Sequence, residues 1–330
     1  RLGSPGDVIE GAGVFTRFLW AGKGFIQTIL GASLPYGLAD WYWIPSRVIS
    51  APGEVEQITE FPFFTVLYGD PHAHLFAMPL ALLGLVWAVS VVLGRVWATN
   101  YPDSNHRSVI RVFAGLLFGG LVYGSLRPTN TWDMPTYLAI GVVALGYSVW
   151  RYFRLNDDSE RKQSGGVTIV RRILFVVGSV GLLIIFSFLL YKPYADWYVL
   201  SYSSLRLWDG TNTQTPDFLI HWGLFLFVVI SWMIWETRDW MAKTPVSSLN
   251  KLKQYTGMII TALVFVLASV IILLLYEVNI AWLALPLAAW AGVLILRPGL
   301  SDSKRIILFL VGTTLVLTLM VEVVVIEGDI

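Results

Sequence analysis

Apolar residues in this chain come in blocks of about twenty, separated by short charged or polar segments. An α-helix rises about 1.5 Å per residue, so a block of that length crosses a hydrocarbon layer about 30 Å thick. The pattern predicts eight spanning helices: 75–97, 108–126, 133–152, 173–191, 218–236, 257–276, 280–296 and 306–326. We therefore expect an all-α fold, a polytopic transmembrane helical bundle, in a multi-pass protein of the cell membrane.

The chain before residue 75 follows a different pattern. Residues 14–34 are apolar, but Arg17 and Lys23 lie in the middle of the run. Charges are costly at the bilayer centre, so we expect an interfacial or re-entrant helix rather than a ninth span. Residues 1–74 are expected to form an extracytoplasmic segment and 75–330 one transmembrane domain. Both ends of the sequence indicate a fragment of a longer chain.

Lysine and arginine are distributed unevenly over the connections between the predicted helices. The connections 95–111, 151–172, 236–256 and 297–305 are basic, and they alternate along the chain. Basic residues in short loops are retained in the cytoplasm. The opposite, extracytoplasmic side receives residues 1–74, the turn 127–132, the loop 191–217 and the tail after residue 326.

Composition supports the membrane assignment and excludes several kinds of chemical site. Of the 330 residues, 56% are hydrophobic and only 14% are charged, whereas a soluble domain is about one quarter charged. The chain has no cysteine, which excludes disulfides, thiolate metal sites and cysteine nucleophiles. The net charge of +1 gives no reason to expect a nucleic-acid partner. Membrane lipid is the partner that the composition predicts.

The first polar string of interest, Gly-Asp-Pro-His-Ala-His, leads into the span at 75. Asp70 suits a helix N-cap and Pro71 the first helical position. A helix that starts at Asp70 places His74 on the same face and turns His72 roughly 200° away. Asp70 and His74 are therefore candidate ligands for a divalent metal or for phosphate, although the string has no HExxH pattern. The alternative is a capped helix with hydrogen-bonded histidines.

The second string is Arg-Pro-Thr-Asn-Thr-Trp-Asp, which joins two predicted spans on the same side. Thr131 can cap the helix that follows, and Asp133 favours the positive end of its dipole. Arg127 either binds a phosphate in bidentate fashion or neutralises Asp133. Asn130 and Trp132 complete the candidate binding residues of this turn.

Two further features lie on the extracytoplasmic side. The loop 191–217 is rich in aromatic and acidic residues, including Tyr194 and Asp196. Such a loop either lies flat in the membrane interface or stacks on sugar rings and accepts their hydroxyl protons. Glu322 lies about sixteen residues into the last predicted span, where a carboxylate is either functional or a protonated partner between helices.

These strings resemble the YYY family of polytopic membrane proteins, a prokaryotic domain of unknown function. The resemblance rests on Trp-Ile-Pro-Ser-Arg ending at Arg47, Glu-Phe-Pro-Phe-Phe at 60–64, the two strings above, and Tyr-Lys-Pro-Tyr at 191–194. The Tyr-Tyr-Tyr signature that names the family is absent and is expected before Arg1. The family is similar in turn to C-type glycosyltransferases, which take sugar from a polyprenyl-phosphate carrier, and this similarity is one of fold alone.

The resemblance and the residues together suggest a membrane glycosyltransferase. Asp70 or Asp133 would be the catalytic base or hold a divalent metal ion, with His72 and His74 assisting. Arg47 or Arg127 would stabilise the departing lipid phosphate. The other expected substrate-binding residues are Asn130, Trp132, Tyr194, Asp196 and Glu322.

Two other classes of function remain open. In one, the protein is a non-catalytic subunit that scaffolds a larger membrane-protein complex, and the polar strings are helix caps. In the other, it is a transporter, which requires broken helices and a polar path to both faces. The inner halves of the predicted spans hold few ionisable residues, which argues against transport.

Overall fold

The computed structural model describes residues 12–33, 65–67, 69, 72–94, 107–152, 165–198 and 204–327. Contacts divide the chain into two units, Arg1–Tyr68 and Gly69–Ile330. The first unit contains helix α1 (Val14–Ile29), in which only Gly24 is buried. A helix was expected here, and its relation to the membrane stays a prediction.

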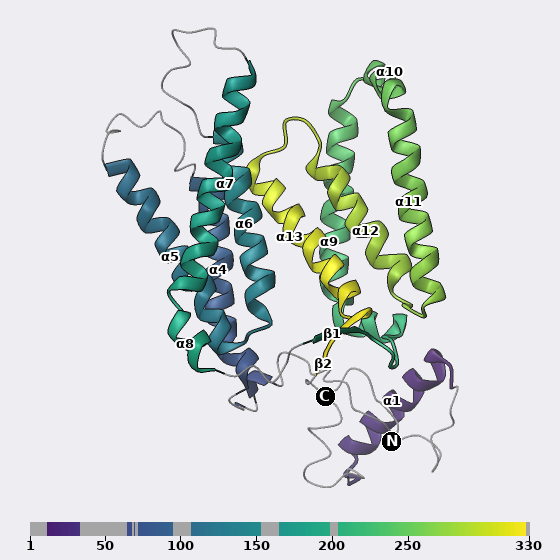
Figure 1. Ribbon diagram of the computed structural model, residues 1–330. Helices are drawn as coiled ribbons and strands as arrows, with labels where there is room; N and C mark the ends of the chain where they lie inside the picture. Colours follow the sequence, from purple (N-terminus) through teal and green to yellow (C-terminus); the bar gives the residue numbers. More distant parts are fainter. Residues whose placement is uncertain are drawn as a thin grey trace. The chain divides into compact units, whose positions relative to one another are not determined.

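The second unit is almost entirely helical (Figure 1). Its helices are α4 (Ala73–Gly94), α5 (Arg107–Thr129), α6 (Asp133–Tyr152), α7 (Gly165–Leu189), α8 (Lys192–Trp197), α9 (Thr215–Lys243), α10 (Leu249–Leu252), α11 (Thr256–Leu275), α12 (Ala281–Ile295) and α13 (Asp302–Met320). Each of the eight predicted spans falls on one of the long helices. Two short strands were not predicted: β1 (Ser204–Leu207) pairs antiparallel with β2 (Val324–Glu327).

Among the described residues, six helices are long and apolar enough to cross a membrane: α4, α9, α13, most of α5 and of α7, and α11 together with the three residues before it. Helix α12 is apolar but has only 15 residues, and α6 has 20 residues with a more polar sequence. Helical segments are expected in a bilayer because every backbone N–H and C=O is then satisfied within its own segment. The structure thus supports a polytopic helical protein, and the count of eight spans stays a prediction.

Helices α4 to α7 pack through glycines on α5 and its neighbours. The ring of Tyr123 is completely buried and lies against Gly84 and Gly141, where an added Cβ would approach it to 2.9 and 2.5 Å. Gly119 likewise faces the indole of Trp87. Close approach over small residues is the usual packing of membrane helices, because lipid supplies no hydrophobic force between them.

Helix α13 contributes to three hydrophobic cores, one of them through Leu308, which packs with residues of α9 and α12. Ile306 packs with the core of α4, α5 and α6, whereas Leu315 and Leu319 pack with residues of α9 and α12. Helix α11 has no buried residue although it is 20 residues long. Its main neighbour is α12.

Successive long helices of the second unit run in opposite directions, so their starts alternate between two ends of the unit. The lower end in Figure 1 holds the starts of α4, α6, α9 and α12, together with α8 and the β1–β2 pair. The upper end holds the starts of α5, α7, α11 and α13. The lower end corresponds to the predicted extracytoplasmic side and the upper end to the predicted cytoplasmic side.

Candidate functional site

The turn between α5 and α6 at the lower end positions Asp133. The amide N–H of Asn130 still donates to the carbonyl of Leu126, which extends the last turn of α5, and the amide N–H of Asp133 donates to the carbonyl of Asn130. The side-chain amide of Asn130 donates to Oδ2 of Asp133 at 3.1 Å. Oδ1 has no hydrogen-bond partner among the described residues. The half-buried carboxylate is therefore oriented on one oxygen and open on the other.

The two histidines lie at the start of α4, but not as the sequence suggested. The helix begins at Ala73, and the carbonyl of His72 accepts the amide N–H groups of Leu75 and Phe76. The carbonyl of His72 thus accepts the first hydrogen bonds of α4, whereas Asp70, the expected cap, lies outside the described residues. The two imidazoles stack with centroids 5.3 Å apart and planes 18° from parallel. The predicted 200° separation is wrong, because His72 precedes the helix and does not follow its periodicity.

His74 lies near Asp133 across the α4–α6 interface. Those two helices pack closely together, and the imidazole of His74 is near enough to act electrostatically on the Asp133 carboxylate. A carboxylate and an exposed imidazole at one helix end can share the work of accepting and passing on a proton. The pairing expected for His74 with Asp70 stays a prediction, because Asp70 lies outside the described residues.

Arg127 lies in the last turn of α5, three residues before Asn130. Its guanidinium is 5.8 Å from the centroid of the Phe188 ring of α7. Within the described part of the chain it makes no ion pair with Asp133, so the expected neutralisation is not found there. The hydroxyl of Thr131 donates to the carbonyl of Arg127 at 2.9 Å. Thr131 thus terminates α5 and does not cap α6.

Helix α8 brings aromatic side chains to the same end. The rings of Tyr194 and Tyr198 stack with centroids 4.8 Å apart. Burial raises the pKa of Tyr194, as does the neighbouring Tyr198, whereas a hydrogen bond with Thr131 and the charge of Arg127 lower it. Tyr194 therefore belongs to the group around Arg127.

Two of the expected binding residues have more ordinary surroundings. Asp196 forms an ion pair with Lys192 one turn away on α8, and both side chains are more than half exposed. Trp132 is half-buried in the α5–α6 turn. Asp196 is better explained as a surface ion pair than as a sugar ligand.

The sequence placed Glu322 inside the last spanning helix, but in the structure this residue lies beyond the end of that helix. Helix α13 ends at Met320, and Glu322 lies in the turn before β2. Its carboxylate accepts the amide N–H of Thr213 at 2.8 Å and the hydroxyl of the same residue. Glu322 thereby fastens the end of α13 to the segment before α9, and no contact between described residues joins it to Asp133.

Arg47 and Asp70 lie outside the described residues, so their expected roles stay predictions. Within the described ranges no three histidine, aspartate or glutamate side chains gather in a group that could hold a metal ion. The lower end therefore offers one cluster, defined by His74, Asn130 and Asp133, beside a second defined by Arg127, Thr131 and Tyr194.

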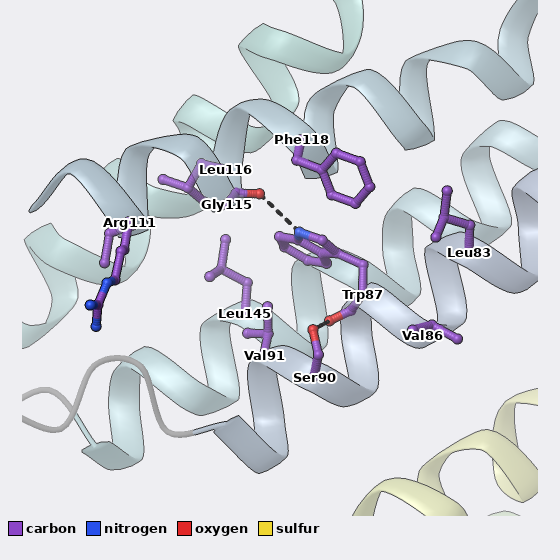
Figure 2. Close-up of a pocket in the computed structure, with 11 residues that line it drawn as sticks. Leu83, Val86, Trp87, Ser90, Val91, Arg111, Gly115, Leu116, Phe118 and Leu145 are labelled. Carbon is purple, nitrogen blue, oxygen red and sulfur yellow. Dashed lines mark hydrogen bonds between the residues drawn. The ribbon is translucent and has the colours of Figure 1, made fainter. Parts of the chain in front are cut away.

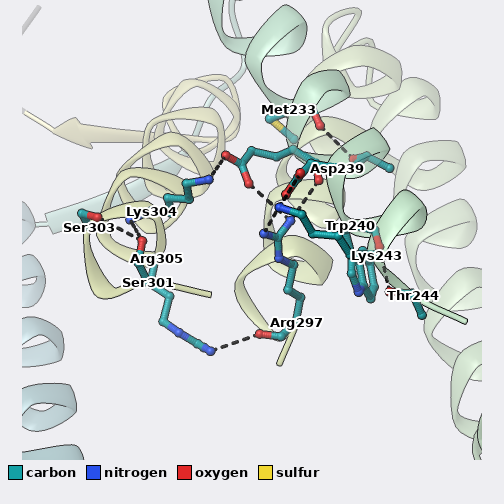
Figure 3. A network of polar contacts seen from close by, with 12 residues as sticks. Met233, Asp239, Trp240, Lys243, Thr244, Arg297, Ser301, Ser303, Lys304 and Arg305 are labelled. Carbon is teal, nitrogen blue, oxygen red and sulfur yellow. Dashed lines mark hydrogen bonds and ion pairs between the residues drawn. The ribbon is translucent and has the colours of Figure 1, made fainter. Parts of the chain in front are cut away.

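Sequence reasoning missed a charged network at the upper end (Figure 3). Glu236 of α9 is completely buried, and its carboxylate pairs with Arg297 at 3.3 Å and with Lys304. Arg297 also donates to the backbone carbonyl of Glu236 and lies 3.8 Å from Asp239. The prediction that the inner halves hold few ionisable groups is wrong at this point, because α9 continues to Lys243. The network ties α9 to the start of α13.

A second buried carboxylate, Asp302, links α13 to α6. The phenols of Tyr147 and Tyr152 both donate to it, the first at 2.6 Å, and Arg151 pairs with it at 3.2 Å. The acidic residue near a helix start was visible in the sequence, but its partners lie about 150 residues away along the chain. No spacing rule connects residues so far apart.

Comparisons with known proteins give one family. Residues 10–330 match the family described as uncharacterized membrane protein (DUF2298). No curated protein and no solved structure matches the chain. The resemblance to a membrane domain of unknown function is thereby confirmed, whereas a relationship to glycosyltransferases is not shown.

Proposed function

The chain belongs to this family of uncharacterized membrane proteins, and on that premise we propose that it is a glycosyltransferase that uses a polyprenyl-phosphate sugar donor at the extracytoplasmic face. The observation that carries the proposal is the placement of Asp133. Asn130 orients one oxygen of its carboxylate, the other oxygen has no hydrogen-bond partner among the described residues, and the charge of His74 acts on the carboxylate from the neighbouring helix α4.

In the proposed reaction, the open oxygen of Asp133 takes the proton of an acceptor hydroxyl. The hydroxyl oxygen forms a bond to the anomeric carbon while the bond from that carbon to the phosphate oxygen breaks. The electron pair of the broken bond goes to the lipid phosphate, whose charge the guanidinium of Arg127 stabilises. His74 receives or returns the proton through its exposed imidazole.

The aromatic residues of α8 supply the surface for the sugar. Apolar faces of sugar rings pack on aromatic side chains, and Tyr198 and Trp197 are 46% and 89% exposed next to the stacked Tyr194. Asp70 is kept as a second candidate base, or as a metal ligand with His74. Since the described residues hold no group of three ligands, no step of the proposal depends on a metal.

The test is a transfer assay with the full-length protein in lipid vesicles and polyprenyl-phosphate sugars. Asp133→Asn keeps the contact with Asn130 but removes the base, and we expect a loss of at least about 100-fold in kcat. Arg127→Gln is expected to raise KM for the lipid donor. Asp209→Asn is the matched control, because Asp209 is an exposed carboxylate at the same end whose ion pair among the described residues is with Arg206. Full transfer by Asp133→Asn, with the control equally active, would overturn the assigned base.

Helix α11 supports one alternative, a non-catalytic subunit of a larger assembly. None of its residues is buried, so a partner protein can cover it as well as lipid can. Gentle purification from native membranes separates the two functions. A stoichiometric partner, together with no transfer activity in either the isolated protein or the complex, would favour the scaffold.

A further inference from the structure

An apolar pocket opens between α4 and α5 in their upper halves (Figure 2). Its volume is about 290 Å³, near the lower end of the range for small-molecule pockets. The walls are formed by Leu83, Trp87 and Val91 of α4, Gly115 and Phe118 of α5, and Leu145 of α6. The pocket lies away from the Asp133 cluster, which is at the lower end of the same helices.

Packing fixes the shape of this pocket. The indole N–H of Trp87 donates to the carbonyl of Gly115 at 2.9 Å, and the ring meets Tyr123 edge to face at a centroid distance of 5.5 Å. A Cβ added to Gly115 would meet no atom within 4 Å, whereas one added to Gly119 would meet Trp87 at 2.6 Å. The space beside Gly115 is therefore open next to a rigid wall.

Apart from Trp87, two of the lining residues carry polar side-chain atoms, Ser90 and Arg111. The hydroxyl of Ser90 donates to the carbonyl of Trp87 at 2.7 Å and is thus satisfied. Arg111 lies one turn inside the start of α5, at one end of the pocket in Figure 2. Within the described ranges its guanidinium forms no hydrogen bond and no ion pair.

We propose that this pocket binds an acyl chain of an anionic membrane phospholipid, with the lipid phosphate on Arg111. The apolar walls suit a hydrocarbon chain, and the guanidinium suits a phosphate held by two parallel N–H donors. Basic pockets between membrane helices on the cytoplasmic side are a known form of anionic-lipid site. This lipid is distinct from the proposed sugar donor, which would bind at the opposite end.

The experiment measures lipid retention by the full-length protein. The protein is reconstituted in vesicles of phosphatidylglycerol and phosphatidylcholine, extracted gently, and examined by native mass spectrometry for bound lipid. We expect the wild type to retain phosphatidylglycerol in preference to phosphatidylcholine. Arg111→Gln should lower that preference about fivefold, the factor associated with one basic residue near an anionic lipid.

Two further variants make the result specific. Gly115→Leu fills the open space beside Trp87 and should release the lipid while leaving the guanidinium in place. This variant separates recognition of the acyl chain from simple attraction of phosphate. Arg171→Gln, at an exposed arginine on the upper part of α7, is the matched control and should retain lipid like the wild type.

Three outcomes would overturn the proposal. They are equal retention of the two lipids by the wild type, equal losses in Arg111→Gln and Arg171→Gln, or full retention by a correctly folded Gly115→Leu. Thermal unfolding of each variant in detergent identifies any that fails to fold, and Gly115→Ala then replaces Gly115→Leu. Sugar transfer is not a readout, so failure here leaves the proposed function unaffected.

Discussion

The phenol of Tyr123 on α5 donates a buried hydrogen bond to the carbonyl of Gly84 on α4, at 2.8 Å. The carbonyl belongs to the backbone of α4, and the absence of a side chain at Gly84 lets the phenol reach it. Gly141 of α6 gives the same ring its space on another side. One tyrosine therefore sets the spacing of three helices.

Replacing Tyr123 by Phe removes this hydrogen bond and keeps the ring. We expect the free energy of unfolding to fall by about 0.5–1.5 kcal/mol, the net value of a typical protein hydrogen bond. Tyr137→Phe is the control, because Tyr137 is half-buried and its phenol has no hydrogen-bond partner among the described residues. Denaturant titration in mixed micelles measures both, and equal stability of the two variants would contradict the role of the Tyr123 bond.

Glycine positions on α5 and α7 offer a matched pair of substitutions. An added Cβ at Gly120 would collide with the Cβ of Phe186 and lie 3.1 Å from its backbone carbonyl carbon, whereas Gly178 has nothing within 4 Å. We expect Gly120→Ala to destabilise the protein by about 1–3 kcal/mol, as overpacked cores do. Gly178→Ala should be neutral or slightly stabilising, because alanine is the better helix former. Thermal unfolding in detergent tests the pair, and a Gly120→Ala protein as stable as Gly178→Ala would refute the contact.

Substituting Glu236 by Gln leaves Arg297 and Lys304 without their buried counter-charge. Removal of one partner from a buried ion pair typically costs 3–5 kcal/mol, so we expect a loss of about 3 kcal/mol or more. Lys243→Gln should change little, because the side chain of Lys243 is 73% exposed in its pair with Asp239. Chemical denaturation compares the two, with equal effects as the contradictory result.

Glu322→Ala should loosen the β1–β2 pair at the lower end. The carboxylate of Glu322 holds both the amide and the hydroxyl of Thr213, and hydrogen bonds to charged groups contribute about 1.5–3 kcal/mol. Hydrogen exchange followed by mass spectrometry should show faster exchange in 204–207 and 324–327, with the middle of α13 unchanged. Protection equal to the wild type would show that the strands hold without Glu322.

The positions of the long helices could be predicted because an apolar run is a local property of the sequence. Helix ends were harder, since they depend on which partners satisfy the last backbone groups. Helix α4 begins at Ala73, three residues after the start that the sequence suggested, and α13 ends before Glu322 because the chain turns there into β2. The helical periodicity says nothing about either event.

The contacts of the polar residues divide in the same way: local contacts could be predicted from the sequence, and contacts between distant residues could not. Asn130 and Asp133 are three residues apart, so their contact follows from a local motif that the sequence displays. Glu236 and Arg297 are 61 residues apart, and nothing in their spacing marks them as partners. The sequence suggested Asp196 as a sugar ligand because it is an acidic residue in an aromatic loop. Its carboxylate instead pairs with the lysine one turn earlier.

The start of α13 is attached to two different helices, and this has a mechanical consequence. At its start, Asp302 fastens it to Tyr147 and Arg151 of α6, and Lys304 fastens it to Glu236 of α9. Both attachments lie within one helical turn at the upper end, far along the helix from Glu322. We therefore expect the start of α13 to act as a pivot: any shift of α6 relative to α9 would move their lower ends, where Asp133 and Glu322 lie, more than their upper ends.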